Sequence, residues 1–417
     1  MTTSLLSPQS SALSPRRILV VAQSGGPSPV VNASLAGAVA QARKHDAFSA
    51  VYGLVHGVEG VLREDLLDLS DVSDEALFEL ARTPGAALGS TRRAIVEADF
   101  ARWRDVFRAH DVGYFAYIGG NGSMWVCHRL AALDPDLRVM GIPKTVDNDL
   151  AATDHAPGYG SAARFLALAV RDTGRDVEAM RSFEDVVILE AMGRNTGWLA
   201  AGSALLKERP DDAPHLVYVP EVPFDEAAFL DDVTRIHDRL GYVFVVVAEG
   251  IRDAAGVQIG ERGAPLDLLG RVVPSLASGA STILADVVRQ RLGLRARVLR
   301  PGLIGRALAS CVSLTDRREA WEVGAAAVAR LAAGESGQMV TLERTSDDPY
   351  TVRLGGAPLL DVAGHEKPLP RDYMDESGTM VTSAFLRYGL PLIEGDTLAL
   401  GRLDAPRVGK RLGNVDL

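Results

Sequence analysis

The chain has 417 residues, 47% of them hydrophobic, and carries a formal net charge of −10 with a pI near 5.4. This length and apolar content predict a globular protein of two or three lobes. The acidic charge argues against a nucleic-acid-binding surface, and no apolar run approaches the roughly 18 residues of a membrane helix. We therefore expect neither nucleic acid nor membrane as a partner, and anionic ligands must be held by local cations.

Residues 1–16 are rich in serine and contain no apolar core segment, so we expect a disordered leader rather than a signal peptide. The two cysteines, Cys127 and Cys311, lie in apolar segments with helical patterns. Buried free thiols are therefore expected instead of a disulfide or a metal pair. Such cysteines fit a reducing compartment, and we expect a cytoplasmic protein.

The first expected element is a strand from Arg17 to Ala22, followed by a glycine loop and a helix that starts near Val30. The loop contains Gly25 and Gly26. Because this loop ends the first strand of an α/β pattern, its amides could line a phosphate site. The same Gly-Gly-Pro sequence is also ordinary turn chemistry, and both interpretations stay open.

A strand near Ala50 to Leu54 and an acidic helix from Ser70 to Arg82 are expected next. Arg92 follows in a segment rich in small residues. On the residues alone, it belongs to a pair of surface arginines.

The central stretch joins two expected strands, Tyr114 to Ile118 and Arg138 to Ile142, to loops rich in polar residues. The first strand stops at GGNGS (119–123), and a helix is expected to open near Ser123, so bare amides and a positive helix end could hold phosphate. The second strand delivers PKTVDND (143–149). Its ammonium, hydroxyl and carboxylates suit phosphoryl transfer with Mg²⁺, although Asp-Asn-Asp alone is often a solvated turn.

The second half continues the alternation of strands and helices. The expected helices are a long one ending near Met180, and others at Pro274 to Leu292, Arg317 to Ala333 and Thr382 to Tyr388. The expected strands are Asp185 to Glu190, Val243 to Val247 and Arg295 to Arg300, with others near Met339 and Tyr350.

Together, GGNGS, PKTVDND, the later Met192-Gly193-Arg194 and PEVPF (220–224) resemble the motifs of the phosphofructokinase family, in the family's order, from about Arg17 to beyond Arg387. The resemblance implies an α/β fold of two Rossmann-like, three-layer lobes with mostly parallel sheets. It also implies a donor-binding lobe over 17–155, an acceptor-binding lobe over 156–315, and a C-terminal part, 316–417, that packs on both.

The resemblance also implies a site. The catalytic residues would be Asp147, Lys144, Thr145 and Arg92. The donor would lie on Gly25, Gly26, Gly120, Asn121, Gly122 and Ser123. The acceptor would be held by Asp149, Met192, Gly193, Arg194, Glu249, Arg297 and Arg306. Mg²⁺ would be held by Asn121, Asp147 and Asp149.

The substrates are less clear than the family. Lys144, TDHAPGYGSAARF (153–165) and KPLPRDY (367–373) resemble the branch that uses pyrophosphate, whereas Gly122 leaves room for ATP. The implied acceptor is fructose 6-phosphate. Asp185, Leu303 and Gly305 depart from the family where a distal phosphate should bind, so a related acceptor such as sedoheptulose 7-phosphate stays open.

Two further expectations concern the assembly of subunits and whether the chain is catalytic. In the family, a cation at the position of Asp185 reaches the site of a neighbouring subunit, which implies a homodimer or homotetramer. The neutral Asn121, together with Leu303 and Gly305 in the acceptor-binding segment, also leaves open that the chain is a non-catalytic regulatory paralogue.

Overall fold

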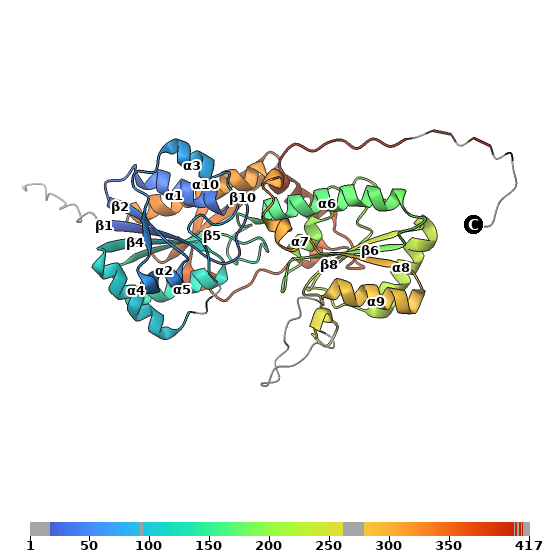
Figure 1. The fold of residues 1–417 in the computed structure, drawn as a ribbon, viewed down its shortest axis with the longest axis horizontal. Helices are drawn as coiled ribbons and strands as arrows, with labels where there is room; N and C mark the ends of the chain where they lie inside the picture. The colour runs from blue at the N-terminus through green and yellow to red at the C-terminus, as the bar shows by residue number, and fades with distance from the viewer. Residues whose placement is uncertain are drawn as a thin grey trace, which may run out of the picture.

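The computed structural model describes residues 17–91, 93, 95–261, 279–403, 405, 406, 408, 409 and 411. Two α/β lobes lie side by side, each with a central sheet covered by helices (Figure 1). Most neighbouring strands run parallel. The predicted α/β class with mostly parallel sheets is therefore confirmed.

The first lobe contains a seven-stranded sheet in the order β11-β10-β5-β4-β1-β2-β3. The edge pairs β2–β3 and β10–β11 are antiparallel, and the other pairs are parallel. Apolar residues run almost without interruption along β1 and β4, as expected for strands covered on both faces. The strands are β1 (Arg17–Gln23), β2 (Phe48–Leu54), β3 (Leu66–Asp68), β4 (Val112–Gly119), β5 (Arg138–Pro143), β10 (Gln338–Asp347) and β11 (Tyr350–Pro358).

Helices cover this sheet on both faces and form a separate hydrophobic core on each. One core involves α1 (Val31–Ala42), α3 (Asp74–Leu80) and α10 (Leu314–Ala332). The other involves α2 (Val58–Arg63), α4 (Glu97–Ala109), α5 (Asn121–Leu133) and α11 (Leu359–Val362). The chain therefore returns to the first lobe after building the second.

The second lobe contains a four-stranded parallel sheet in the order β7-β8-β6-β9. Helices α6 and α9 lie on opposite sides of it (Figure 1). The strands are β6 (Val186–Ala191), β7 (Leu216–Tyr218), β8 (Val243–Ala248) and β9 (Ala296–Leu299). The helices are α6 (Tyr159–Ala179), α7 (Trp198–Gly202), α8 (Glu226–Leu240) and α9 (Ala280–Leu292), with a short 3₁₀ turn η1 (Ile259–Glu261).

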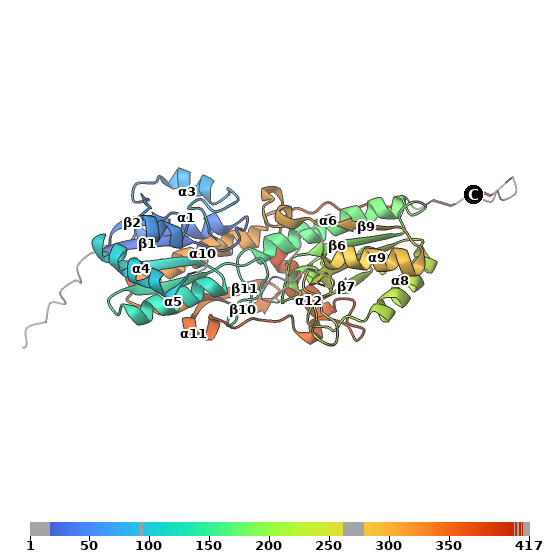
Figure 2. The same ribbon diagram turned by 60° about the horizontal axis from the view of Figure 1, so that its bottom comes forward.

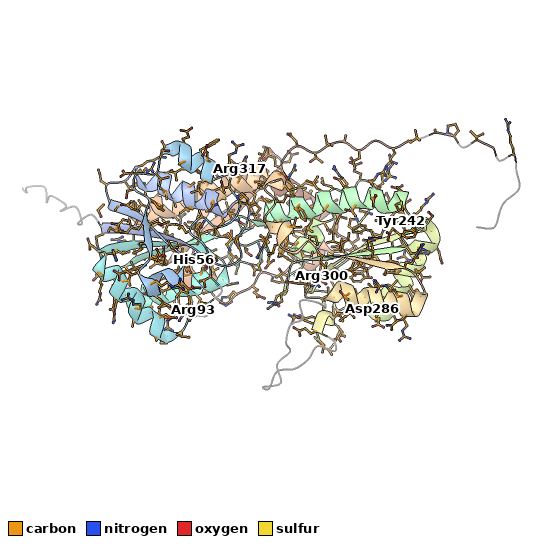
Figure 3. All side chains as sticks on the ribbon, viewed as in Figure 1. His56, Arg93, Tyr242, Asp286, Arg300 and Arg317 are labelled. Carbon is orange, nitrogen blue, oxygen red and sulfur yellow. The ribbon has the colours of Figure 1, made fainter. Side chains whose placement is uncertain are left out.

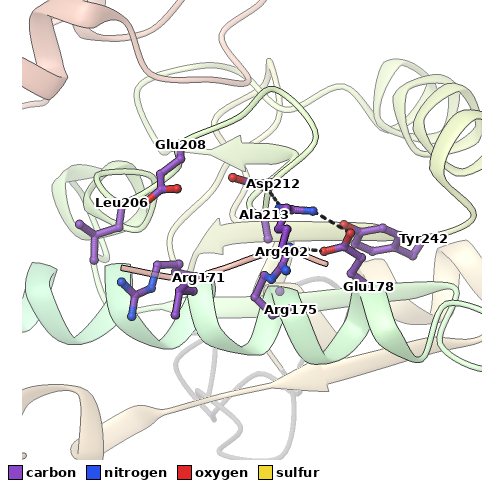
Figure 4. A pocket seen from close by; sticks show the side chains of 11 residues that line it. Arg171, Arg175, Glu178, Leu206, Glu208, Asp212, Ala213, Tyr242 and Arg402 are labelled. Atoms are coloured by element: carbon purple, nitrogen blue, oxygen red, sulfur yellow. Dashed lines mark hydrogen bonds and ion pairs between the residues drawn. The ribbon is translucent and has the colours of Figure 1, made fainter. Parts of the chain in front are cut away.

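The C-terminal part crosses from the first lobe to the second. Between α11 and α12 (Ser383–Gly389) the chain passes through η4 (Arg371–Tyr373), and Figure 2 shows this connection running from one lobe to the other. The turn η5 (Leu390–Ile393) follows. Beyond it, Arg402 forms ion pairs with Glu178 and Asp212 at the rim of a pocket on the second lobe (Figure 4).

Several expected elements differ in detail. Helix α5 begins at Asn121, two residues before Ser123. Helix α9 begins at Ala280; residues 274–278 of the expected helix lie outside the described residues. Cys127 is a buried free thiol in α5, whereas Cys311 is only half-buried and lies in a 3₁₀ turn, η3 (Ala309–Cys311), so the expectation of a buried helical thiol was wrong for Cys311.

Among the described residues, no helix combines the length and apolarity that a membrane crossing requires.

Candidate active site

The loop after β1 (the donor loop, residues 24–29) faces the PKTVDND segment after β5. The Lys144 ammonium donates to the Gly26 carbonyl at 2.8 Å. Gly25 has a φ of +75°, and a Cβ there would lie 3.1 Å from Lys144 Nζ. A side chain at Gly25 would therefore be strained and would crowd the ammonium.

These residues line an open cavity of about 420 Å³ in the first lobe. Its polar wall includes the donor loop, Thr145 and Ser123, and its outer wall includes Ile95 and Trp125. Burial lowers the pKa of Lys144 to about 8, with a further contribution from the positive charge of Arg306. A phosphate in this cavity would favour the charged ammonium.

Helix α5 presents its N-terminus to the same cavity, through Gly120, Gly122 and Ser123. The Ser123 hydroxyl is hydrogen-bonded to the hydroxyl of Ser24 in the donor loop. A Cβ on Gly122 would meet no atom of the described residues within 4 Å. The glycine loop therefore combines the positive end of a helix, which favours anions, with space on one side.

The side chain of Asn121 is hydrogen-bonded to a distant part of the chain. Its side-chain amide donates to the His365 carbonyl at 2.9 Å, and its side-chain oxygen accepts from the Gly364 amide at 3.1 Å. The sequence analysis expected this side chain to face the metal. In the structure it fastens the start of α5 to the connection between the lobes.

The PKTVDND segment continues into the catalytic turn (residues 147–154), which carries Asp147 and Asp149. The Thr145 hydroxyl accepts from the Asp147 amide at 3.1 Å and is bonded to the Asp149 carboxylate. Burial raises the pKa of Asp147 to about 6, and the negative charges of Asp149 and Glu249 add to the effect. Asp147 Oδ1 is buried and accepts no hydrogen bond within the described chain.

Asp147 is therefore a carboxylate that can exchange a proton near neutral pH. Asp149 also has a raised pKa, chiefly because of burial. The described residues contain no group of three or more His, Cys, Asp or Glu side chains placed to hold a metal ion.

The loop after β6 (the acceptor loop, residues 192–197) approaches the catalytic turn from the second lobe. The Thr196 hydroxyl donates to the Asp147 carbonyl at 3.1 Å. Glu249, at the end of β8, accepts from the Gly193 amide, and its carboxylate lies near the charge of Arg194. Burial raises the pKa of Glu249. The structure thus brings Gly193, Arg194 and Glu249 together beside Asp147.

Arg306 joins the two sides of the site. It lies in η2 (Gly302–Arg306) and lines a small cavity with Met192 in the second lobe. Its guanidinium occupies the place that a side chain at Gly26 would fill. The sequence assigned Arg306 to the acceptor alone, because spacing along one chain does not show that the arginine crosses to the donor loop.

The pair formed by Glu190 and Arg300 was not among the predicted site residues. Glu190 lies one residue before the end of β6, accepts from the Ser281 amide and hydroxyl at 2.9 and 2.8 Å, and pairs with Arg300 at 3.1 Å. Arg300 lies on the side of the second lobe that faces the first (Figure 3). The sequence signal that could have identified Glu190 is a carboxylate near the end of a buried strand, shortly before Met-Gly-Arg.

Two predicted residues lie away from this group. Arg297 is on β9, and its guanidinium is paired with Glu184 at the opposite, amino end of β6. Beside it, both oxygens of Asp185 accept from Arg295 at 2.8 Å. These contacts hold the pKa of Asp185 below its usual range. Within one chain, Arg297 does not reach the acceptor loop.

Arg92 lies outside the described residues, so its predicted role is not tested. Its neighbours are held in place by acids: Arg93 pairs with Asp99 at 2.7 Å, and the Thr91 hydroxyl donates to Glu59 at 2.5 Å. Arg93 lines the donor cavity and is labelled in Figure 3. It is therefore a further cation at this cavity that the sequence analysis did not assign.

Facing loops at the carboxyl ends of parallel strands in two sheets, with glycine-rich turns, a buried lysine and a protonatable aspartate, define an α/β phosphotransferase. Residues 18–331 match the family model described as phosphofructokinase. The chain belongs to the phosphofructokinase family.

Several relatives are similar over most of the chain. The pyrophosphate–fructose 6-phosphate 1-phosphotransferase of Xanthomonas campestris pv. campestris is 40% identical, covering 93% of this chain and 94% of the relative. The protein of the same name from Rhodospirillum rubrum is 41% identical, covering 94% and 98%. A sulfofructose kinase from Alkalicoccus urumqiensis is 35% identical, covering 86% and 92%.

A solved structure has the same fold. The crystal structure of the pyrophosphate-dependent phosphofructokinase from Marinobacter aquaeolei is 35% identical and superposes with a TM-score of 0.82, covering 94% of this chain and 95% of that one. The predicted phosphofructokinase fold is therefore confirmed.

Proposed function

We propose that this protein transfers a phosphoryl group from pyrophosphate to the 1-hydroxyl of fructose 6-phosphate or a closely related sugar phosphate. The observation that carries the proposal is the place of Lys144, whose ammonium lies 2.8 Å from the Gly26 carbonyl at the wall of the donor cavity. A lysine there offsets the charge of a compact polyphosphate donor. The names of the Xanthomonas and Rhodospirillum relatives, which specify both substrates, support it.

The proposed reaction is an in-line displacement. The acceptor oxygen forms a bond to phosphorus, the bridging P–O bond of pyrophosphate breaks to release orthophosphate, and the hydroxyl proton passes to Asp147. Lys144 and Arg306, which flank the donor loop, offset the negative charge of the transferring group. Glu249 and the acceptor loop orient the sugar beside Asp147.

The residues fit a magnesium ion that is held largely by substrate. Mg²⁺ in phosphoryl-transfer sites binds one or two carboxylates, the substrate phosphates and several waters. Asp147, whose buried oxygen accepts no hydrogen bond from the part of the chain that the structure describes, and Asp149 would supply the carboxylates. Asn121 is a weaker candidate because its carboxamide already bonds Gly364 and His365. The bound metal would neutralise phosphate charge.

The deciding experiment compares initial rates with pyrophosphate and with ATP at one saturating concentration of fructose 6-phosphate. We expect turnover with pyrophosphate that exceeds turnover with ATP by at least about tenfold, a difference of about 1.4 kcal/mol. Turnover with ATP alone would overturn the choice of donor. No turnover with either donor, across several acceptors, would favour a non-catalytic paralogue.

ATP is the second candidate donor because of the unfilled space at Gly122. Among the described residues, no atom lies within 4 Å of a Cβ built there, and Trp125 and Ile95 line the same cavity with apolar surface that a nucleoside could cover. If ATP is used, Gly122→Asp should suppress that activity by placing a carboxylate in this space. The rate with pyrophosphate should change much less.

The acceptor is the least constrained part of the proposal. Leu303, which is 65% exposed, and Gly305 lie beside Arg306, where the family resemblance implies a polar ring and a glutamine. The Alkalicoccus relative is named for a sulfofructose instead of a sugar phosphate. The acceptor panel should therefore contain fructose 6-phosphate, sedoheptulose 7-phosphate and sulfofructose, ranked by kcat/KM. We also propose a cytoplasmic homo-oligomer.

A further inference from the structure

One short stretch of chain contacts the start of α5, the catalytic turn and the acceptor loop. Residues 364–369, here called the crossover segment, lie in the connection between the lobes that Figure 2 shows between α11 and α12. At its start, Gly364 and His365 bond the side chain of Asn121 beside the donor cavity. In its middle, the Lys367 amide donates to the Asp149 carbonyl at 2.8 Å.

The same segment holds the acceptor loop. The Glu366 carboxylate accepts from the Asn195 side-chain amide at 2.8 Å, and the Lys367 carbonyl accepts from the Trp198 indole at 3.0 Å. Farther along, the Leu369 amide and the Gly197 amide donate to one oxygen of Glu221, at 2.7 and 3.0 Å. The start of α5 beside the donor cavity, the catalytic turn and the acceptor loop are therefore all bonded to six consecutive residues.

The side chain of Lys367 enters the space behind the catalytic turn. Its ammonium donates to the Thr153 and Asp154 carbonyls at 3.1 and 2.5 Å and lies 3.5 Å from the Asn148 side-chain oxygen. It also lies over the Trp198 ring, 4.9 Å from the centroid. Burial lowers the pKa of this lysine to about 8. Methylene groups would fill such a place at lower cost, because a buried ammonium loses its hydration.

The catalytic turn needs such support. Asn148 and Ala152 have φ values of +54° and +62°, in the left-handed region that non-glycine residues avoid. Each such residue costs about 1–3 kcal/mol and persists only where its surroundings over-determine it. Tyr388 also holds the turn: its hydroxyl donates to the Asp154 carbonyl at 3.0 Å and accepts from Asn148 at 2.9 Å. We call the contacts of Lys367 and of Tyr388 with this turn its two tethers.

We propose that Lys367 is a positioning residue for phosphoryl transfer. Its ammonium, with the Tyr388 hydroxyl, holds the strained catalytic turn so that Asp147 and Asp149 face the donor and acceptor loops in reacting geometry. Lys367 touches neither substrate, so its loss lowers kcat more than it raises either KM. The kinetic part of this proposal rests on the proposed function.

The chain contains a matched control for each tether. Lys207 is also half-buried, has a pKa lowered to about 8 by burial, and donates to the carbonyls of Pro210 and Pro214 at 3.0 Å, but it lies away from the site. Tyr218 is also buried, and its hydroxyl has no hydrogen-bond partner within the described chain. The pairs are Lys367→Met with Lys207→Met, and Tyr388→Phe with Tyr218→Phe.

The kinetic test measures kcat, both KM values and Tm for the four variants. A displacement of about 1 Å can cost about 100-fold in rate, so Lys367→Met should lower kcat by about 10- to 100-fold, with each KM within about threefold of wild type. Tyr388→Phe, which loses weaker bonds, should lower kcat by about 2- to 10-fold. Both controls should keep kcat within about twofold, even where Tm falls. Should Lys367→Met fail to fold, the tyrosine pair decides.

The proposal is overturned if Tyr388→Phe and Lys367→Met keep the kcat of their controls, or if they raise KM at constant kcat. A second readout does not depend on activity. Amide hydrogen exchange over residues 147–154 should quicken in Lys367→Met and Tyr388→Phe and stay unchanged in both controls. A wild type without turnover would defeat the proposed function, and unchanged exchange would then defeat the tether separately.

Discussion

Asp147 combines three properties that a proton acceptor in this site requires. Its pKa is raised to about 6, one of its oxygens is buried with no hydrogen-bond donor among the described residues, and its backbone is held by Thr145 and Thr196. A base with this pKa is mostly deprotonated at pH 7 yet still accepts a proton readily. Sequence alone indicated the carboxylate but not the burial that sets its pKa.

Replacing the base tests this assignment. Asp147→Asn should lower kcat by about 10²- to 10⁴-fold, the range expected for the loss of general base catalysis, while the dissociation constant of the acceptor changes little. Steady-state kinetics and equilibrium binding of the acceptor measure the two effects. Asp71→Asn, an exposed carboxyl in the first lobe, is the control. An Asp147→Asn enzyme with more than about a tenth of wild-type kcat would contradict the role.

The pH dependence of kcat tests the cause of the raised pKa. Because the base must be deprotonated, kcat should fall as pH drops below about 6. Burial is the largest cause, and the negative charges of Asp149 and Glu249 act in the same direction. Glu249→Gln removes one of these charges, so the acid limb should move to lower pH.

This profile is measured at saturating acceptor, where a higher KM in Glu249→Gln has no effect. Ionisation of the substrates is common to both enzymes and cancels in the comparison. Glu75→Gln, an exposed carboxyl on α3, should leave the acid limb in place. An unmoved limb in Glu249→Gln would show that Asp147 does not sense Glu249.

At the scale of elements, helices α1 and α10 pack through glycines that face each other's backbone. A Cβ on Gly37 of α1 would overlap the Trp321 carbonyl, and a Cβ on Gly324 of α10 would overlap the Ser34 carbonyl. These contacts let a helix from the C-terminal part of the chain lie directly on the first helix. Close approach, and not backbone conformation, requires glycine at both places.

Gly324→Ala tests this packing, because two effects oppose each other. In an exposed helix, alanine is more favourable than glycine by about 1 kcal/mol. Overpacking against backbone that cannot move away typically costs about 1–3 kcal/mol, and we expect this cost to exceed the gain in helix propensity. We expect a lower free energy of unfolding by chemical denaturation. Gly401→Ala, where no described residue has an atom within 4 Å of the added Cβ, should be close to neutral, and a stabilised Gly324→Ala would refute the close contact.

The sequence predicted the strands and loops that build the site better than it predicted the helices around them. Continuous apolar runs such as Val243 to Val247 identify strands covered on both faces, and the glycine motifs mark their ends. Elements as short as β3 and α2 carry too few residues for a period to show. Helix α4 was not predicted, although it could have been, because Phe100, Trp103 and Phe107 have helical spacing.

At the scale of the whole molecule, the chain alternates between the lobes. After β9 it returns through α10, β10 and β11 to the first lobe, and the crossover segment then leads back to the second. Motifs located the loops, but nothing local in residues 338–358 shows that β10 pairs with β5. The contacts of Lys367 with the catalytic turn could not be predicted either, because they join residues more than 200 positions apart.

The assembly of subunits supplies the last prediction. Within one chain, Arg297 is paired with Glu184 at the amino end of β6, whereas the acceptor loop follows the carboxyl end of that strand. If Arg297 binds the acceptor's distal anion, as the family resemblance implies, it must act in the site of a neighbouring subunit. Arg297→Ala should then raise the KM for the acceptor and leave the KM for the donor unchanged.

Subunit mixing distinguishes action in the neighbouring site from action in the same chain. In a hybrid dimer of Asp147→Asn with Arg297→Ala, one site carries both lesions, and the other combines an intact Asp147 with the partner's intact arginine. Refolding the two variants together should therefore yield more activity, at low acceptor concentration, than the sum of the separate variants. Light scattering of the mixture verifies that dimers or tetramers form. Activity equal to that sum, in a mixture that contains hybrids, would place Arg297 outside the shared site and leave Arg194 and Arg306 as the cations that hold the acceptor.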